Sequence, residues 1–485
     1  MKQRYSSSPM VPKPGSSSPA RARQDIYRSQ ITPRSSLVNR LVKIYGLSSD
    51  EVTDHMRSGT LTIDVVGIGK MGLPLAALLA REGARVIGVR RNERMVDEIN
   101  AGRCPIEEEP KLDEILAEVV SKGKLEATTD AEWAARESDV ILILVPLLVD
   151  ERGNPDFAQM ESACVKASAG IEKGDLVIVE TTMPPGSTRG VVLPMLESSG
   201  LRGGEDFGVV HAPERLMTGR VIRNIYRYPK IVGGIDDEST EAASGIYTPF
   251  GEVVRVSSLE TAELVKVSEG VYRDVNIAYA NTLAMFCESH GVDAWEVIRA
   301  ANHQTQDYCH IHRPGSGVGG HCIPVYPWFL ITKGTQYGTD VSLIREARRV
   351  NDSMPGHMKE LIDSSIRSRG LAPESSSVGI LGLAFRGGVK ETRLSPTIKL
   401  LGLLGDYREV LLHDPLFTDD EIRSMGFTPS DFDTVLGCDV VALMTDHQEY
   451  RDAVERLNRI GGKLVDGRNV VPTAEYKIGN VSRRD

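Results

Sequence analysis

A single cysteine, Cys322, follows a segment that is rich in glycine. Residues 314–328 read PGSGVGGHCIPVYPW, with four glycines directly before His321 and the thiol. A glycine-rich backbone can approach a ligand closely while it presents one side chain. An isolated cysteine is more often a small buried residue than a reactive one, but this setting favours a nucleophile. Because a cysteine reacts as its thiolate, we expect a cationic or dipolar neighbour to lower its pKa.

A second pattern lies near the start of the chain, where residues 67–72 read GIGKMG between a β-rich run and a helical run. The three glycines would allow a tight turn, close approach of a pyrophosphate, and packing of the helix on the strand. The first turn of the helix would then offer N–H groups to the phosphates. We therefore predict a dinucleotide site that uses Gly67, Gly69, Lys70, Met71 and Gly72.

The residues after the next β-rich run bear on whether the dinucleotide is NAD or NADP. An acidic residue there would bind the ribose hydroxyls of NAD, but the sequence has Arg90 and Arg91. An arginine pair could hold the 2′-phosphate of NADP, or both side chains could be solvated while backbone and water bind the ribose. We keep both readings, with NAD as the expected cofactor and NADP as the alternative.

The elements that must position these residues follow an α/β pattern. Short, nearly continuous apolar runs alternate with helical stretches, which is typical of parallel strands covered on both faces. The expected strands are 61–67, 84–89, 139–145, 175–180 and 207–211, then 377–383, 409–412, 439–444 and 463–466. Between the two series, apolar residues at helical spacing predict one long helix over 259–304. The predicted fold is α/β, with two Rossmann-like doubly wound domains joined by a long central helix.

The predicted domain organisation has five parts. Residues 1–35 are rich in Ser, Pro and Arg, and we expect a disordered tail there. A helical extension over 36–58 follows, then an NAD(P)-binding Rossmann domain over 59–255. A central helical domain for dimerisation and catalysis is expected over 256–355, and a C-terminal Rossmann-like domain over 356–485.

Composition narrows the class of protein. A net charge of −10 in 485 residues argues against a general nucleic-acid binder. The six cysteines are dispersed, without zinc-like spacing, so we expect free thiols, a reducing compartment and no metal. No apolar run reaches the roughly 20 residues that span a bilayer, and the start of the chain lacks a signal-peptide core. We expect a cytoplasmic protein with no membrane or nucleic-acid partner.

A series of motifs resembles the UDP-glucose/GDP-mannose dehydrogenase family, from about Thr60 to about Val470. Within that family the chain is most similar to the branch that oxidises UDP-N-acetylhexosamines. The motifs, in chain order, are VGIGKMGLPLA, ETTMPPGST, HAPERLMTGR, KIVGG, TAELVKVSEGVYRDVNIAYAN, GVGGHCIP, GLAFRGGVKETRLSP and VDGRN.

The resemblance implies a four-electron oxidation of the sugar C6 alcohol to a carboxylate, with two NAD(P)+ reduced. It assigns the nucleophile to Cys322, which would form a thiohemiacetal and then a thioester. Lys266 matches the lysine that stabilises the developing oxyanion. Glu214 matches the carboxylate linked to proton transfer and water activation. UDP-N-acetylmannosamine is the expected substrate, with UDP-N-acetylglucosamine or UDP-glucose as alternatives.

The resemblance also implies binding residues and an assembly. Arginine suits phosphate through its bidentate geometry; Arg393 resembles one that reaches the substrate from the C-terminal domain, in this family across a homodimer. A homodimer or higher homo-oligomer is expected. Besides the residues above, the expected cofactor contacts are Pro146 and Thr182, and the expected substrate contacts are Arg215, Gly219, Asn276, Gly319 and Arg393.

Four positions depart from the family pattern. Arg90 replaces the acid discussed above, Leu147 a threonine, Gly270 an asparagine and Tyr326 an aspartate. In the better-known relatives the last three positions help to hold the catalytic water and the C6 oxygen. Other groups could order the water, with Tyr326 donating to the oxyanion, or the enzyme could be slow or stop at another product. A non-catalytic nucleotide-sugar-binding protein is the competing hypothesis.

Overall fold

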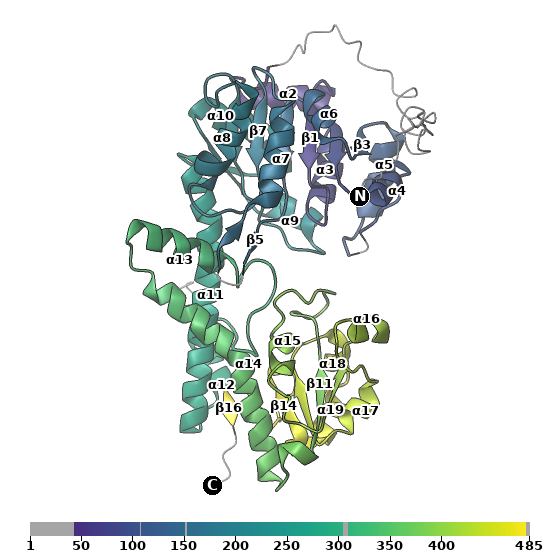
Figure 1. Cartoon of the computed structure of the whole chain (residues 1–485), viewed down its shortest axis with the longest axis vertical. Helices are drawn as coiled ribbons and strands as arrows, with labels where there is room; N and C mark the ends of the chain where they lie inside the picture. Colours follow the sequence, from purple (N-terminus) through teal and green to yellow (C-terminus); the bar gives the residue numbers. More distant parts are fainter. Residues whose placement is uncertain (1–42, 107, 151–152, 304–308, 482–485) are drawn as a thin grey trace, which may run out of the picture.

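The computed structural model of the chain describes residues 43–481, apart from 107, 151–152 and 304–308. Two α/β units lie at opposite ends of the molecule, and the long helix α11 (Leu259–His290) runs between them (Figure 1). This arrangement agrees with the predicted fold class of two Rossmann-like domains joined by a long helix. The predicted tail over 1–35 lies outside the described residues.

The first unit is built on an eight-stranded sheet. Its strands are parallel except that β8 and β9 pair antiparallel. All five strands predicted in this region are present, whereas the short strands β3, β9 and β10 were not anticipated. Across the sheet the order is β10 (Val253–Arg255), β9 (Lys230–Gly234), β8 (Gly208–His211), β7 (Leu176–Val179), β4 (Val140–Ile143), β1 (Thr62–Val66), β2 (Arg85–Val89) and β3 (Leu125–Thr128).

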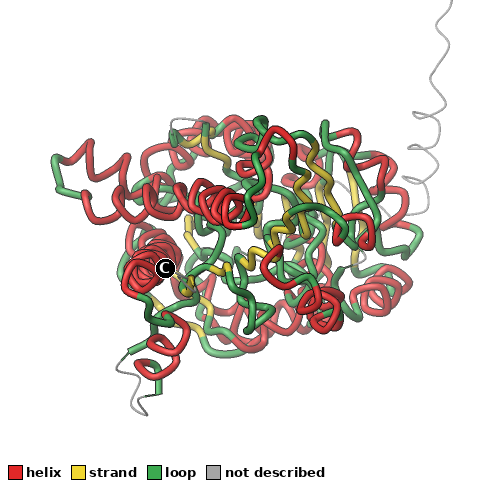
Figure 2. The backbone as a smooth tube through the Cα atoms, turned by 90° about the horizontal axis from the view of Figure 1, so that it is seen from below, coloured by secondary structure: helices red, strands yellow, loops and turns green. Residues whose placement is uncertain are grey.

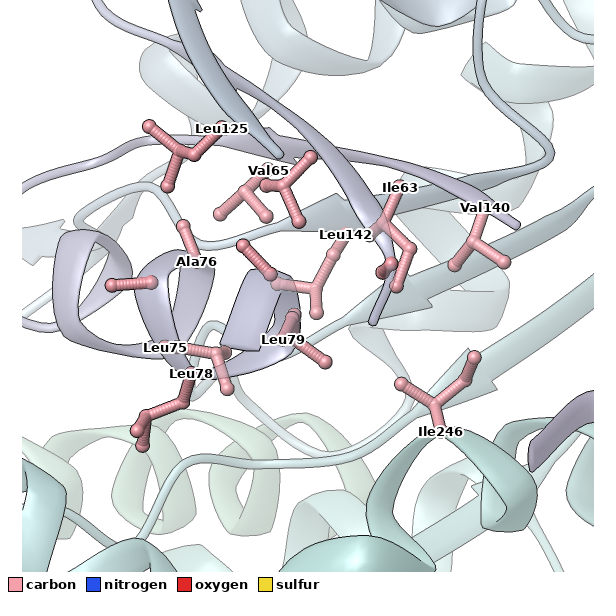
Figure 3. Packing of buried hydrophobic residues seen from close by; sticks show 14 of the residues in the cluster. Ile63, Val65, Leu75, Ala76, Leu78, Leu79, Leu125, Val140, Leu142 and Ile246 are labelled. Carbon is pink, nitrogen blue, oxygen red and sulfur yellow. The ribbon is translucent and has the colours of Figure 1, made fainter. Parts of the chain in front are cut away.

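The strands are apolar throughout because both faces of the sheet are covered. In β4, Val140 and Leu142 enter one hydrophobic cluster, while Ile141 and Ile143 enter another on the opposite face. Figure 3 shows the first cluster, in which Leu75 and Leu79 of α3 lie among side chains of the central strands. The helices of this unit are α3 (Gly72–Arg81), α4 (Glu93–Asn100), α5 (Leu112–Ser121), α6 (Ala131–Arg136), α7 (Ala158–Ser168), α8 (Leu193–Leu196), α9 (Val221–Arg227) and α10 (Asp237–Tyr247).

Helix α2 (Ser49–Ser58) precedes the first strand and packs on α10. Ser48 and Glu51 form a reciprocal capping box at its start, and Gly59 ends it in the left-handed conformation. Val52 and Met56 are buried in the core of the first unit. The helical extension was predicted over 36–58, and its residues 36–42 lie outside the described part.

The helical centre differs from the prediction of one helix over 259–304. Helix α11 ends at His290, because Gly291 takes a left-handed φ of 68° and closes it, and α12 (Ala294–Ala301) follows as a separate helix. Helices α13 (Tyr326–Tyr337) and α14 (Ser342–Ser368) then pack against α11. The boundary expected between 355 and 356 falls inside α14.

The second unit has a six-stranded sheet in the order β12 (Glu409–His413), β11 (Ser377–Leu381), β13 (Val440–Leu443), β14 (Leu464–Asp466), β15 (Tyr476–Lys477) and β16 (Asn480–Val481). Only the β15–β16 pair is antiparallel. Helix α14 covers one face of this sheet. In the tube view, helices lie on both sides of the strands (Figure 2). The smaller helices are α15 (Pro396–Leu401), α16 (Asp419–Ser424), α17 (Phe432–Leu436), α18 (Gln448–Asp452) and α19 (Val454–Arg459).

Within the described residues, no helix is both long and apolar enough to cross a membrane.

Candidate active site

The glycine turn after β1 is shaped as the sequence predicted. Gly67 has a φ of 108°, and a Cβ there would lie 2.2 Å from the Leu144 carbonyl oxygen. A Cβ on Gly72 would lie 2.3 Å from the Gly67 carbonyl oxygen, so neither position accepts a side chain. Helix α3 starts at Gly72 without a side-chain cap. In its first turn the Leu73 N–H donates to the Gly69 carbonyl oxygen and Pro74 has no N–H, so the turn offers an anion such as a pyrophosphate mainly the Gly72 N–H.

Arg90 lies over this turn. Its Nη1 donates to the Ile68 carbonyl oxygen over 2.6 Å and would lie 3.6 Å from a Cβ on Gly69. Burial lowers the pKa of the guanidinium, and its Nε is buried without a hydrogen-bond partner in the described part of the chain. Arg91, in contrast, is exposed. The two arginines of the sequence motif therefore have different surroundings, and only Arg90 is next to the glycines.

Other predicted residues form the rim of the turn. Lys70 makes a 2.7 Å ion pair with Glu108, and both side chains are exposed. Gly219 has a φ of 78°, and a Cβ there would lie 3.2 Å from the Glu108 carbonyl oxygen. The neighbouring carboxylate of Glu109 accepts the N–H groups of Val221 and Ile222 at the start of α9. This rim joins the turn to the loop after β8.

The loop that carries Cys322 packs on the second unit. A Cβ on Gly319 would lie 2.6 Å from Phe385 Cβ, and one on Gly320 would lie 2.8 Å from the Phe385 ring. The Gly320 N–H donates to the Arg393 carbonyl oxygen over 2.8 Å. These two glycines thus admit another part of the chain. Cys322 follows them, and its carbonyl oxygen accepts the Tyr326 N–H at the start of α13.

The surroundings of the Cys322 thiol differ from the expectation of a lowered pKa. Burial raises its pKa above the ordinary value, and the charge of Glu214 raises it further. The Tyr326 hydroxyl, through a hydrogen bond, and the charges of Lys266 and Arg273 lower the pKa, but they do not outweigh desolvation. Desolvation dominates because the thiol packs against an apolar cluster that contains Val267 and Phe329.

Helix α11 brings the cationic groups to this cluster. Lys266, Gly270 and Arg273 follow one another at three- or four-residue steps, so they lie on one face of the helix. The Lys266 Nζ lies 5.9 Å from the centre of the Tyr326 ring. Sequence analysis identified Lys266 but missed Arg273, which a pattern of charges on one helix face could have indicated.

Glu263, on the same helix, holds the loop 184–188 in place and was also missed. Its carboxylate accepts the backbone N–H and the hydroxyl of Thr188 over 2.7 Å and 2.6 Å, and the Gly186 N–H as well. Burial raises the pKa of Glu263 to about 7, although these donors act in the opposite direction. The carboxylate thereby fixes this loop relative to Lys266.

The loop after β8 supplies Glu214 and Arg215. Glu214 Oε2 accepts the Leu216 N–H over 2.6 Å, and its charge acts on Cys322. Arg215 pairs with Glu269 of α11 and donates to the Pro229 carbonyl oxygen. Glu214 therefore acts on the thiol through its charge, whereas the guanidinium of Arg215 is directed to α11.

Thr181 and Thr182 connect two loops at the end of the first sheet. Thr181 Oγ1 donates to the Val145 carbonyl oxygen over 2.7 Å and so holds the segment that contains Pro146 and Leu147. Thr182 is buried, and its Oγ1 accepts the Tyr326 hydroxyl over 3.3 Å. Leu147 packs on the same apolar cluster as Cys322.

Two predicted substrate contacts, Asn276 and Arg393, differ in their surroundings. The Asn276 side chain donates to the His310 carbonyl oxygen over 2.6 Å and accepts the His312 N–H over 2.8 Å. Arg393 lies in the loop before α15, and its Nε is buried without a partner among the described residues. Arg386, in the same loop, interacts electrostatically with Cys322. The sequence analysis did not single out this arginine.

Three family models match the chain consecutively. They are the NAD binding domain, the central domain and the UDP binding domain of the UDP-glucose/GDP-mannose dehydrogenase family, over residues 61–251, 260–353 and 379–473. The chain belongs to this family. It is therefore a nucleotide-sugar dehydrogenase with an NAD-type cofactor domain and a UDP-binding domain, as the sequence motifs predicted.

Individual relatives match this chain over most of its length and over nearly all of their own. A UDP-N-acetyl-D-mannosamine dehydrogenase from Pyrococcus horikoshii is 34% identical over 88% of this chain and 100% of its own length. An NDP-N-acetyl-D-galactosaminuronic acid dehydrogenase from Ralstonia nicotianae is 36% identical over 80% of this chain and 92% of its own.

The fold agrees with solved structures of this family. The structure of the Pyrococcus horikoshii UDP-D-ManNAc dehydrogenase gives a TM-score of 0.79 and covers 86% of this chain and 99% of that one, at 34% identity. A UDP-N-acetyl-mannosamine dehydrogenase from Staphylococcus aureus gives 0.74, with 86% and 99% covered at 32% identity.

Metal ligands do not gather in the described part of this dehydrogenase: no group of three or more His, Cys, Asp or Glu side chains there could hold a metal ion. The rings of His310 and His312 pack edge to face, 5.1 Å apart.

Proposed function

We propose that this dehydrogenase oxidises the C6 alcohol of a UDP-N-acetylhexosamine, UDP-N-acetylmannosamine first among them, to the uronate. The observation that carries the proposal is the meeting of Cys322, Lys266 and Glu214 from three separate elements, between the cofactor-binding and UDP-binding units. The names of the relatives support an N-acetylhexosamine as the sugar. Two NAD(P)+ molecules, bound in turn, would each accept one hydride, one in each of the two oxidations.

The side chains of this chain take complementary roles in the proposal. The Cys322 thiolate adds to the C6 aldehyde formed by the first oxidation, and the second oxidation leaves a thioester that water hydrolyses. Glu214, whose charge faces the thiol, takes the thiol proton. The Lys266 ammonium stabilises the negative charge on the C6 oxygen. Arg393, with an unpartnered buried Nε, and Arg386 are proposed to meet the substrate from the UDP-binding unit.

For the cofactor, we propose that NAD binds at the turn formed by residues 67–72 and that NADP is also accepted. Arg90 lies next to Gly69 and keeps an unpartnered Nε, so it can meet a 2′-phosphate. The test compares kcat/KM for NAD and NADP in the natural chain and in Arg90→Asp. We expect the substitution to lower the NADP value about tenfold or more relative to NAD. Equal losses for both cofactors would contradict this use of Arg90.

The decisive experiment measures formation of reduced cofactor with UDP-N-acetylmannosamine, UDP-N-acetylglucosamine and UDP-glucose. We expect two reduced cofactors per uronate and the highest kcat/KM with UDP-N-acetylmannosamine. Cys322→Ala should abolish uronate formation, while Cys287→Ala, which removes a buried thiol on α11, serves as the matched control. Mass spectrometry of the quenched reaction should find the sugar on the peptide of Cys322.

Other outcomes would select the alternatives. Highest activity with UDP-glucose would indicate a UDP-glucose-type dehydrogenase. Tight binding of UDP-sugars without any cofactor reduction would support a non-catalytic binding protein, which the raised pKa of Cys322 and the apolar Leu147 also favour.

We also propose a homodimer formed through α11, and a cytoplasmic location that suits the six free thiols. Large side chains on this helix remain exposed in the single chain, which is unusual for a packed monomer. They are Leu264, Tyr272, Tyr279 and Phe286, at 43%, 60%, 56% and 58% exposure. Tyr279→Glu should convert the dimer to a monomer in analytical ultracentrifugation, whereas a monomeric natural chain would contradict the assembly.

A further inference from the structure

Two departures from the family pattern, Gly270 and Tyr326, meet in the structure. A Cβ built on Gly270 would lie 2.4 Å from Tyr326 Cδ2 and 3.3 Å from its Cβ and Cγ. Such distances are far shorter than any van der Waals contact, so the Tyr326 ring occupies the space that a side chain at position 270 would need. The two changes are therefore coupled, because tyrosine on α13 fits only where α11 carries glycine.

The contact places the Tyr326 ring in the apolar cluster against which Cys322 packs. The ring is 7% exposed and packs in the cluster of Val267, Val271 and Phe329. Its hydroxyl donates to Thr182 Oγ1 over 3.3 Å and also interacts with the Cys322 thiol. The phenol is thus a polar group inside an otherwise apolar environment, where a hydrogen bond to a charged sulfur is stronger than in water.

We propose that Tyr326 is a catalytic residue whose hydroxyl donates a hydrogen bond to the Cys322 thiolate, and that Gly270 is required to admit its ring. The thiol proton leaves to Glu214, whereas the phenol keeps its own proton and turns from Thr182 toward the sulfur. The aldehyde carbon then accepts the sulfur electron pair. Burial keeps the pKa of Tyr326 well above its usual range, so the phenol remains a donor throughout. The catalytic step rests on the proposed function, but the hydrogen bond does not.

Several charged groups face the thiol and enter its titration. Lys266 and Arg273 act from α11, Glu214 from the loop after β8, and Arg386 from the loop after β11. All of them remain when only the Tyr326 hydroxyl is removed. Tyr326→Phe keeps the ring in the cavity at Gly270, so a change in the titration of Cys322 reports the hydroxyl itself.

The test follows alkylation of Cys322 by iodoacetamide against pH, read on its own peptide by mass spectrometry. In Tyr326→Phe we expect the midpoint to rise by about one pH unit, with alkylation about tenfold slower below it. Tyr337→Phe, at the exposed end of the same helix, should match the natural chain. With an active sugar, kcat of Tyr326→Phe should fall about tenfold at neutral pH, recover at high pH, and leave KM unchanged. An unchanged midpoint would overturn the proposal.

A double-mutant cycle tests the coupling to Gly270. Gly270→Asn alone should lower the melting temperature sharply, because its side chain collides with the ring, and Gly270→Asn with Tyr326→Asp should restore most of it. Additive losses would refute the coupling. If the natural chain oxidises none of the sugars, the proposed function fails, yet the alkylation midpoints still decide whether Tyr326 donates to the thiolate. A normal sugar oxidation with no midpoint shift would remove this inference alone.

Discussion

The first strands of the two sheets end in the same kind of turn but lead to different structures. Gly67 and Gly382 have φ of 108° and 100°, and their N–H groups donate to the last residues of the neighbouring strands, Val89 and His413. After Gly67 the helix begins at Gly72, whereas after Gly382 it begins only at Pro396. The short turn leaves the start of a helix open, while the long loop packs around the glycines before Cys322.

The residue directly after β2 in the first sheet is the cation Arg90, whereas the residue directly after β12 in the second sheet is the anion Asp414. Arg90 donates to the Ile68 carbonyl oxygen, whereas Asp414 accepts the N–H groups of Leu383 and Ala384 over 2.6 Å and 2.9 Å. Asp414 also accepts His447 Nε2–H over 3.1 Å, since His447 Nδ1 accepts the Gly388 N–H. In the second unit the loop amides are thus occupied by a side chain. The same fold thus leaves the start of α3 without a side-chain cap, where an anion can bind, and fixes the loop after β11 by bonding its amides to a carboxylate.

The largest difference should appear when these two residues are removed. Asp414→Ala should lower the free energy of unfolding by about 3–5 kcal/mol, because it leaves three backbone N–H groups and a buried imidazole unpaired. Arg90→Ala should cost only about 1 kcal/mol, since it removes one hydrogen bond. Urea denaturation measures both values. Equal losses of stability in the two variants would contradict this difference between the two units.

The next largest effect on stability is expected at the middle residue of β1, compared with the middle residue of β11. Asp64 is buried, and neither carboxylate oxygen has a hydrogen-bond partner in the described part of the chain, so burial raises its pKa well above the ordinary value. Gly379 takes the same place in β11. Asp64→Val should raise the free energy of unfolding by about 1–3 kcal/mol. Asp64→Asn keeps an unpaired polar group and should gain little; a destabilised valine variant would point to a missed partner.

Two buried carboxylates that hold loops should respond to pH in opposite directions. Burial raises the pKa of Glu263 to about 7, so its folded state keeps a proton that the unfolded chain has lost above its ordinary 4.5, and stability falls as pH rises through this window. Burial alone would raise the pKa of Asp414, but His447 and the Ala384 N–H lower it overall. Its contribution is therefore lost as pH falls below the ordinary aspartate value.

Glu263→Gln tests this contrast. The variant should show less loss of stability between about pH 4.5 and 7 than the natural chain, with a difference on the order of 1 kcal/mol. Thermal melts at a series of pH values measure it, and Glu260→Gln, one turn earlier and half exposed, is the control. An identical pH profile for Glu263→Gln would mean that the carboxyl titrates as an ordinary one.

The smallest effect on stability is expected at the ion pair beside the turn of residues 67–72. Lys70 and Glu108 are 45% and 37% exposed, so their ion pair contributes little. Lys70→Ala should change the free energy of unfolding by less than about 0.5 kcal/mol. A larger loss would show that this rim is part of the fold rather than of the ligand site.

Local patterns were sufficient for much of the fold. The central strands were predictable because both sheet faces are covered, which makes each strand an unbroken apolar run. The edge strands β3 and β10 and the strand β9 next to β10 lack such a run, and the helix break at Gly291 was hidden by apolar spacing that continues beyond it. The roles of Glu263 and Arg273 depend on contacts between elements, which no local pattern reports.

Neighbours within a few residues were enough to predict the α/β class and the glycine turn and to single out Cys322 as the candidate nucleophile. The packing of distant segments was needed to see that Arg90 lies over the turn of residues 67–72, that burial raises the pKa of the Cys322 thiol, and that Gly270 meets Tyr326. These properties arise from desolvation and steric exclusion between segments far apart in the chain, and both depend on how α11 and α13 pack together.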